Sequence, residues 1–172
     1  ILLASKFQTI SEHLKQFIVE TSNEELIPVI DESRPWIRTD DMNPWMTSKK
    51  TQPIESSQIN NMVIDSNFEA EFSQHLERLS SSGKILSWVK NDHLGFKIWY
   101  VFKGEIKTYY PDFIIKNDEE NFVIIETKGI KKDQDEFKWN AIKEWVIAVN
   151  NGDFANWKFE TVLTKEDFNK IL

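Results

Sequence analysis

The sequence YYPDFII at residues 109–115, then the polar turn KNDEEN, then FVIIETKG at residues 122–129, decides the fold. Both apolar runs are rich in β-branched residues, and the short polar break between them predicts two adjacent antiparallel strands. Asp112 lies at the start of the first run, and Glu126 and Lys128 lie at the end of the second. Pairing of the runs brings Asp112 close to Glu126, and strand alternation places Glu126 and Lys128 on one face.

Four consecutive apolar residues, 122–125, predict a strand that is buried on both faces. Charged side chains at the end of such a strand lie at a sheet edge or a cleft. Ordinary structural roles remain open for them at this point. Pro-Asp pairs are common in turns, and Glu126 and Lys128 could form a salt bridge on an exposed strand.

The flanking sequence predicts helices on either side of this sheet. The segment 28–58 has no regular period and contains four prolines, so we expect an irregular connection there. We therefore predict an α/β fold with a helical and irregular extension at residues 1–58 and one domain at residues 59–172. The expected helices are 5–20, 66–79 (with Gly83 as the C′ residue), 133–149 and 164–172, and the expected strands are 62–64, 85–89, 96–103, the two runs above and 157–163.

Glu69 is a further acid whose position needs a reason. It falls on the same helical stripe as Phe72 and Leu76, which faces the core. Burying a charge is costly unless it is paired or bound to a metal. One explanation is a capping box, in which Glu69 bonds back to Ser66. The other is that Glu69 joins Asp112 and Glu126 as a third acid.

Composition excludes several classes of protein. The chain has 172 residues, a net charge of −7, no cysteine and three histidines, which excludes disulfides and makes a zinc site improbable. No apolar run reaches the roughly 18 residues of a membrane span, and no signal peptide is visible. The chain does not begin with Met, so we expect it to start inside a longer polypeptide. The acidic balance argues against coating nucleic acid through bulk charge, although it leaves a nuclease possible.

Two or three carboxylates beside a lysine favour metal-assisted phosphodiester hydrolysis. Carboxylate oxygens suit Mg²⁺, which binds through one or two carboxylates, waters and phosphate oxygens. A lysine can orient the attacking water or stabilise the transition state as a point charge. A hydrolase that acts on carbohydrate through an acid pair is a weaker alternative, since Lys128 has no part in it.

The words PDF at residues 111–113 and ETK at residues 126–128 resemble the PD-(D/E)xK nuclease superfamily. Longer sequence motifs resemble, more specifically, the C-terminal endonuclease region of type III restriction enzyme Res subunits and related DEAD/DEAH-box helicase–nucleases. The resemblance runs from about residue 59 to residue 157, and one small departure is Phe68, where relatives often carry Trp. The words are INNMVIDSNFE at 59–69, WVKNDHLGFKIWY at 88–100, YPDFII at 110–115, IIETKG at 124–129 and WVIAVNNGDFANW at 145–157.

This resemblance implies a restriction-endonuclease-like core, in which a mixed central sheet is flanked by helices. It implies that Asp112 and Glu126 hold Mg²⁺ (with Mn²⁺ as a possible substitute) together with the Thr127 carbonyl. Lys128 is then the catalytic lysine, and Glu69 is the acid from the first core helix.

The resemblance also implies partners: double-stranded DNA, an upstream ATP-using helicase domain in the same chain, and a methyltransferase recognition (Mod) subunit in a prokaryotic cytoplasm. Lys138 matches a helix lysine of relatives that contacts phosphate, although a solvated helix lysine explains it equally well. Lys131 and Lys90 are further candidates for DNA contact, and Trp88 is expected in the core. A catalytically silent module that binds DNA or a protein is the main alternative function.

Overall fold

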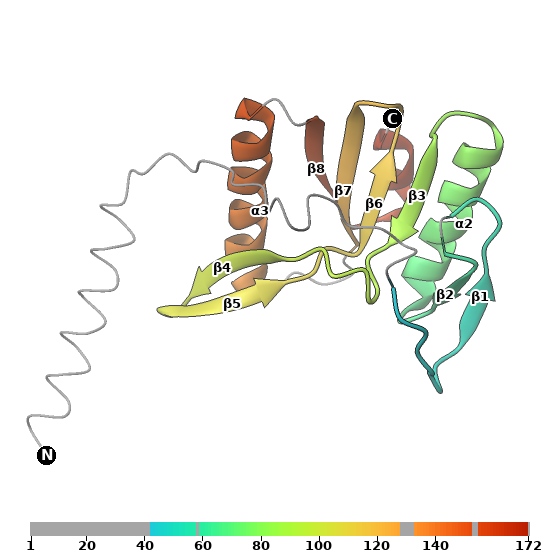
Figure 1. The fold of residues 1–172 in the computed structure, drawn as a ribbon, viewed down its shortest axis with the longest axis horizontal. Helices are drawn as coiled ribbons and strands as arrows, with labels where there is room; N and C mark the ends of the chain where they lie inside the picture. The colour runs from blue at the N-terminus through green and yellow to red at the C-terminus, as the bar shows by residue number, and fades with distance from the viewer. Residues whose placement is uncertain (1–41, 58, 128–132, 153–154, 172) are drawn as a thin grey trace, which may run out of the picture.

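The computed structural model describes residues 42–57, 59–127, 133–152 and 155–171. These residues form a mixed α/β fold (Figure 1). The helix expected at residues 5–20 lies outside them. In chain order the described elements are β1 (Thr51–Pro53), β2 (Asn61–Val63), α2 (Asn67–Ser81), β3 (Ser87–Lys90), β4 (Ile98–Phe102), β5 (Glu105–Tyr109), β6 (Phe113–Lys116), β7 (Asn121–Thr127), α3 (Asp133–Asn151), β8 (Asn156–Val162) and the 3₁₀ helix η2 (Lys165–Lys170).

A four-stranded sheet in the order β3-β6-β7-β8 forms the centre of the molecule. Strands β6 and β7 pair antiparallel with Phe113 opposite Ile125, which confirms the pairing predicted for the two apolar runs. Strand β8 is parallel to β7, and α3 makes the connection between them, as parallel neighbours require. The sheet is therefore mixed.

Strand β7 is buried on both faces, as its sequence predicts. Val123 and Ile125 pack in one core cluster with Phe72 and Leu76 of α2. Ile124, between them, packs in a second cluster with Ile142 of α3. Figure 1 shows the sheet standing between these two helices. Each fully buried aliphatic side chain of this kind stabilises the fold by about 1.5–3 kcal/mol relative to leaving it exposed.

The run at residues 109–115 is two strands and not one. Tyr109 ends β5, which pairs with β4 in a separate two-stranded sheet, and β6 begins only at Phe113. Pro111 lies between them and has no N–H to donate to a strand partner. The structure therefore has five strands between α2 and α3, where the sequence predicted four. The turn between β4 and β5 contains Lys103 and Gly104, which both have positive φ, 53° and 72°, as a two-residue type I′ hairpin requires.

Both ends of α2 are capped. The Ser66 hydroxyl accepts a hydrogen bond from the Glu69 N–H at 3.1 Å. At the other end the Gly83 N–H bonds to the Ser80 carbonyl, and the Lys84 N–H bonds to the Leu79 carbonyl, both at 2.9 Å. These two bonds form a Schellman motif with Gly83 at C′, as predicted from the sequence.

Gly83→Ala is expected to lower the free energy of unfolding by about 1 kcal/mol. Gly83 has φ +70°, and a residue with a Cβ is strained in that left-handed conformation. A Cβ at Gly83 meets no atom within 4 Å, so the loss reports backbone strain alone. Urea unfolding measures it. Ser81→Ala, in the last turn of α2, is the control and should not destabilise. Equal stability of Gly83→Ala and the wild type would contradict the capping role.

The packed part of the chain begins before residue 59. Strand β1 pairs with β2, and Ile54 is 6% exposed in the core. The Trp88 indole N–H donates to the Ser56 hydroxyl at 3.1 Å, and Trp88 is itself a core residue, as expected. The irregular connection expected at residues 28–58 thus contains a strand and a core residue that the sequence did not reveal. The division of the chain into two domains stays a prediction.

The closing helix differs in type from the expectation. Residues 165–170 form a 3₁₀ helix, and Phe168 at its centre is buried against Phe72 with ring centroids 5.2 Å apart. The Thr164 N–H donates to the Asp167 carboxylate at 2.9 Å, consistent with the predicted start at Thr164. None of the helices in the described ranges has both the length and the apolar character needed to cross a bilayer.

Candidate active site

The end of the central sheet where β6 begins and β7 finishes brings Asp112 to Glu126 and Thr127. The Asp112 N–H donates to the Ile125 carbonyl at 3.1 Å, which extends the β6–β7 ladder by one residue. The Asn91 N–H donates to the Asp112 carbonyl at 2.8 Å. The backbone of Asp112 is therefore fixed from both neighbouring segments.

The Asp112 carboxylate binds the last residue of β7. Its Oδ2 accepts hydrogen bonds from the Thr127 N–H at 2.7 Å and from the Thr127 hydroxyl at 2.6 Å. Burial raises the pKa of Asp112, and the nearby Glu69 charge raises it further. The two Thr127 bonds and the Lys90 charge oppose this rise in pKa without cancelling it. The surroundings therefore disfavour the charged form of Asp112, and a nearby cation would favour it.

Glu126 is 4% exposed and faces the α3 side of the sheet, in step with Ile124. The Tyr109 hydroxyl donates to Glu126 Oε2 at 2.6 Å. Burial and the Glu126 charge raise the pKa of Tyr109 well above its usual value, so its hydroxyl remains a donor. Lys138 Nζ lies 5.4 Å from the centroid of the Tyr109 ring and 3.4 Å from Oδ1 of the fully buried Asp135.

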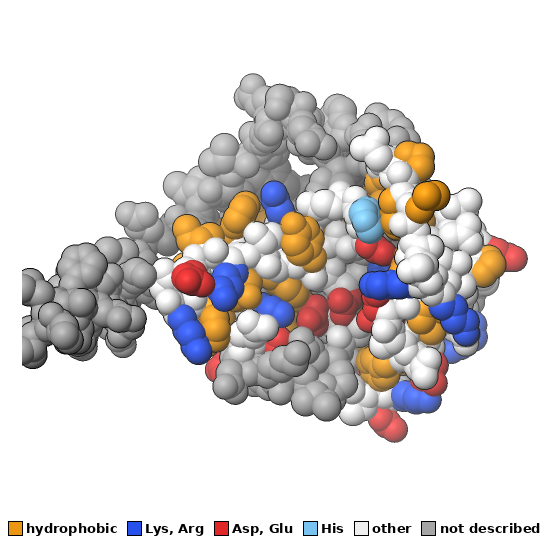
Figure 2. Space-filling model, turned by 90° about the horizontal axis from the view of Figure 1, so that it is seen from below, with side chains coloured by type: hydrophobic (Ala, Val, Ile, Leu, Met, Phe, Trp, Pro, Cys, Tyr) orange, Lys and Arg blue, Asp and Glu red, His pale blue; other side chains and the backbone are white. Residues whose placement is uncertain are grey.

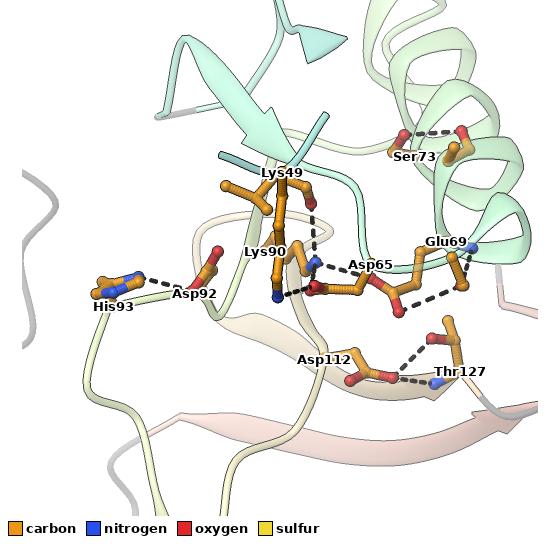
Figure 3. A network of polar contacts seen from close by, with 12 residues as sticks. Lys49, Asp65, Glu69, Ser73, Lys90, Asp92, His93, Asp112 and Thr127 are labelled. Atoms are coloured by element: carbon orange, nitrogen blue, oxygen red, sulfur yellow. Dashed lines mark hydrogen bonds and ion pairs between the residues drawn. The ribbon is translucent and has the colours of Figure 1, made fainter. Parts of the chain in front are cut away.

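A second group of charges lies beside Asp112 (Figure 3). Lys90, at the end of β3, is 7% exposed. Its Nζ contacts Asp65 Oδ2 at 2.5 Å, Glu69 Oε2 at 2.7 Å and the Val63 carbonyl at 2.9 Å. Lys49 reaches the other oxygen of Asp65 from the surface. We call Lys49, Asp65, Glu69 and Lys90 the ion-pair network.

Glu69 is partly buried, and its two carboxylate oxygens have different surroundings. Its Oε1 accepts from the Ser66 hydroxyl at 3.3 Å, at the N-terminus of α2. Its Oε2 is buried, with the Lys90 ammonium as ion-pair partner but no hydrogen bond of good geometry. Its charge also acts on Asp112. Glu69 therefore faces the same interior as Asp112.

Lys90 carries its charge inside this network. Burial alone would lower the pKa of Lys90, but the hydrogen bond to Asp65 and the charges of Asp65 and Glu69 outweigh it and raise the pKa. The ammonium named from the sequence as a candidate DNA contact thus lies against two acids. Lys138 is partly buried on α3. Lys128 and Lys131 lie outside the described residues.

The Asp112 and Glu126 carboxylates are the candidate ligands for Mg²⁺. In the described part of the chain, no group of three or more His, Asp and Glu side chains could hold a metal ion. Mg²⁺ needs only one or two carboxylates because waters and substrate oxygens complete its octahedron. Asp112 and Glu126, which end adjacent strands, meet that number, and Asp112 Oδ1 has no hydrogen bond from the described residues. The residues present fit the ion in number and chemistry.

Two positioning residues were missed from the sequence. Asn91 is 9% exposed, and its Nδ2 donates to the Phe96 carbonyl at 2.7 Å and to the Pro111 carbonyl at 2.9 Å, which holds the bend before Asp112. Tyr109 binds Glu126. The contacts of Asn91 with Pro111 and of Tyr109 with Glu126 join segments far apart in the chain, and no local spacing rule marks them. The alternating apolar pattern of β4 was the only signal near them.

Comparison of the chain with protein-family models, with curated proteins and with solved structures gave no match. Membership of a nuclease family therefore stays a prediction that rests on the sequence words and on the site.

Proposed function

We propose that this chain is a Mg²⁺-dependent endonuclease module that hydrolyses DNA phosphodiester bonds, with a PD-(D/E)xK-type core. The observation that carries the proposal is the position of Asp112, just before β6, where it is bound by Thr127 at the end of β7, next to Glu126. The raised pKa of Asp112 supports it, because burial and a neighbouring acid charge leave a demand for positive charge.

Each residue has a role in this proposal. Asp112 and Glu126 would hold Mg²⁺ with the Thr127 carbonyl. What a bound Mg²⁺ supplies is a lower pKa for a coordinated water and compensation of charge on the phosphate. Lys128 orients the attacking water or stabilises the transition state as a point charge. Glu69 adds negative charge to the site from the first turn of α2, held in place by Lys90.

The proposal extends to the assembly. The chain contains no G-x-x-x-x-G-K-[ST] phosphate-binding loop, so ATP would be used by an upstream helicase part of the same polypeptide. A methyltransferase-type Mod subunit would supply the recognition sequence. The whole would be a type III restriction subunit acting on double-stranded DNA.

One observation favours a catalytically silent nuclease-fold module as the second candidate. The Lys90 ammonium already lies against Asp65 and Glu69 and neutralises charge that a cation could otherwise offset. Such a chain would bind DNA or a protein without cutting.

Metal binding separates the two candidates. The nuclease is expected to bind Mn²⁺ between Asp112 and Glu126 in a crystal soaked with the ion, with Lys128 near the metal. The restriction subunit that contains this chain is expected to cleave DNA with Mg²⁺ and not with EDTA. A soaked crystal with no metal at Asp112, together with a subunit that does not cleave, would support the silent module instead.

A further inference from the structure

The β4–β5 hairpin has one covered face and one open face. Its covered face packs on α3, in the cluster that contains Ile98, Tyr100, Tyr109 and Ile142. On the other face Val101 and Ile106 are paired across the strands and are 42% and 74% exposed. Trp99, on the same face as Val101, is 60% exposed. Exposed apolar side chains gathered on one strand pair mark an interaction surface.

Three lysines lie on this hairpin: Lys97 at the open face, Lys103 in the turn, and Lys107, which pairs with Tyr100, on the covered side. Lys97 Nζ lies 5.1 Å from the centroid of the Trp99 ring, and Lys103 and Lys107 Nζ each lie 5.3 Å from that of Phe102. Glu105 is the single acid between residues 97 and 107, 3.6 Å from Lys107. The hairpin is thus locally basic in a chain of net charge −7.

The hairpin leads directly into the candidate active site. Strand β5 ends at Tyr109, whose hydroxyl binds Glu126, and Asp112 follows three residues later. Figure 2 shows hydrophobic and lysine side chains intermixed over the hairpin, next to a group of acidic side chains on the same side of the molecule. A polymer held on the hairpin would therefore pass close to the acids.

We propose that the β4–β5 hairpin binds DNA beside the acids, through Lys97, Trp99, Val101 and Ile106 on its open face together with Lys103 in the turn and Lys107 on the other side of β5. The lysines contact phosphates, and Trp99 contacts sugar or base. The choice of DNA rests on the proposed function and on charge: a locally basic hairpin with an exposed Trp99 complements a polyanion with flat bases. Binding of this hairpin to a groove of a partner protein would not explain why three lysines lie in so short a segment.

The test measures binding of a short labelled DNA duplex to the whole chain in EDTA, so that no cleavage is required. Lys97→Gln/Lys103→Gln/Lys107→Gln is expected to weaken binding by about tenfold or more at low salt. It should also reduce the slope of log K against log salt by about 0.9 for each phosphate that the variant no longer neutralises. Trp99→Ala, at an exposed position that folding tolerates, is expected to weaken binding to a single strand by about fivefold or more.

Lys84→Gln/Lys116→Gln/Lys158→Gln is the matched control. It makes the same change in net charge on the α2–β3 turn, at the end of β6 and on β8, so it should bind DNA as the wild type does. Equal weakening by both triple variants would overturn the proposal, because bulk charge would then explain the effect. The proposal would also be overturned if the hairpin variants bound DNA as tightly as the wild type. The same holds if the chain dimerised through Trp99 and did not bind DNA.

Failure of this inference and failure of the proposed function give different results. A chain that cleaves DNA with Mg²⁺ while the hairpin variants bind normally keeps the nuclease and loses the hairpin surface. A chain whose DNA binding needs the hairpin lysines, but which neither binds Mn²⁺ at Asp112 nor cleaves in its subunit, keeps the surface and loses the nuclease.

Discussion

Asp112→Asn is expected to abolish Mg²⁺-dependent DNA cleavage while making the folded chain more stable at neutral pH. The loss of cleavage should be at least about 100-fold, the upper value for residues that merely support a metal ligand. The neutral amide cannot supply the charge that the cation needs. Because its oxygen can still accept the Thr127 N–H bond, the bend at residues 111–113 should be retained.

The gain in stability follows from the sign of the pKa shift. The pKa of Asp112 is raised in the folded state, mainly by burial, so the folded chain holds a proton that the unfolded chain has already released. As pH rises from the unfolded pKa, about 3.9, through the higher folded pKa, wild-type stability falls and then levels off. Asn does not titrate. The free energy of unfolding of the variant should therefore rise relative to that of the wild type between the unfolded and the folded pKa, and the difference should persist at higher pH.

Urea unfolding in EDTA at several pH values and a plasmid cleavage assay with the intact subunit measure the two effects. Lys128→Ala should also abolish cleavage, and ATP hydrolysis by the subunit should survive both changes. Glu119→Gln removes an acid on the same β6–β7 hairpin, where its side chain is 82% exposed, and should change neither property. Full cleavage by Asp112→Asn and Lys128→Ala would show that the site is misassigned.

Lys90→Met is expected to be the most destabilising single change at the site, by about 3–5 kcal/mol, the usual cost of removing one partner from a buried ion pair. The methylene stem is replaced by a side chain of similar size, so packing is nearly preserved. Asp65 and Glu69 lose the ammonium that lies between them. The pKa of Lys90 is raised, so its contribution is complete below about pH 10.4 and is lost only as pH rises through the folded pKa.

A double-mutant cycle isolates the Lys90–Glu69 pair. Glu69→Gln in the Lys90→Met background should recover part of the lost stability, because the uncompensated acid is then gone. Lys49→Met removes the surface partner of Asp65, where the side chain is 62% exposed, and should leave stability almost unchanged. Similar losses for Lys90→Met and Lys49→Met would contradict the distinction between a buried and an exposed partner.

Local pattern was enough to predict the central hairpin, α2 with its cap at Gly83, α3 and the strand after it, although not that this strand is parallel to β7. Hydrophobic period and capping residues depend only on near neighbours in the sequence. The four consecutive apolar residues of β7 likewise predict that this strand is buried on both faces. The split between β5 and β6 was missed because β-branched and aromatic residues continue through Tyr110, and the break depends on Pro111 and on pairing with β4.

The candidate site was likewise predictable only in part from the sequence. Asp112 and Glu126 were placed together because hairpin register follows from the turn between two runs. The partner of Glu69 was not predictable, because Lys90 reaches it from a strand twenty-one positions later in the chain. Lys90 in sequence is only a basic residue after Trp88 and Val89, and nothing local shows that its ammonium is buried.

The alternation along β7 has a geometric consequence for access. Glu126 projects with Ile124 toward α3, whereas Thr127, one residue on, projects with Ile125 toward α2 and holds the Asp112 carboxylate there. The two acids thus approach from opposite sides of one strand. A ligand that touches both acids must therefore reach across the end of that strand. A polymer that crosses the end of β7 could reach both acids, whereas a ligand held on one face of the sheet would reach only one of them.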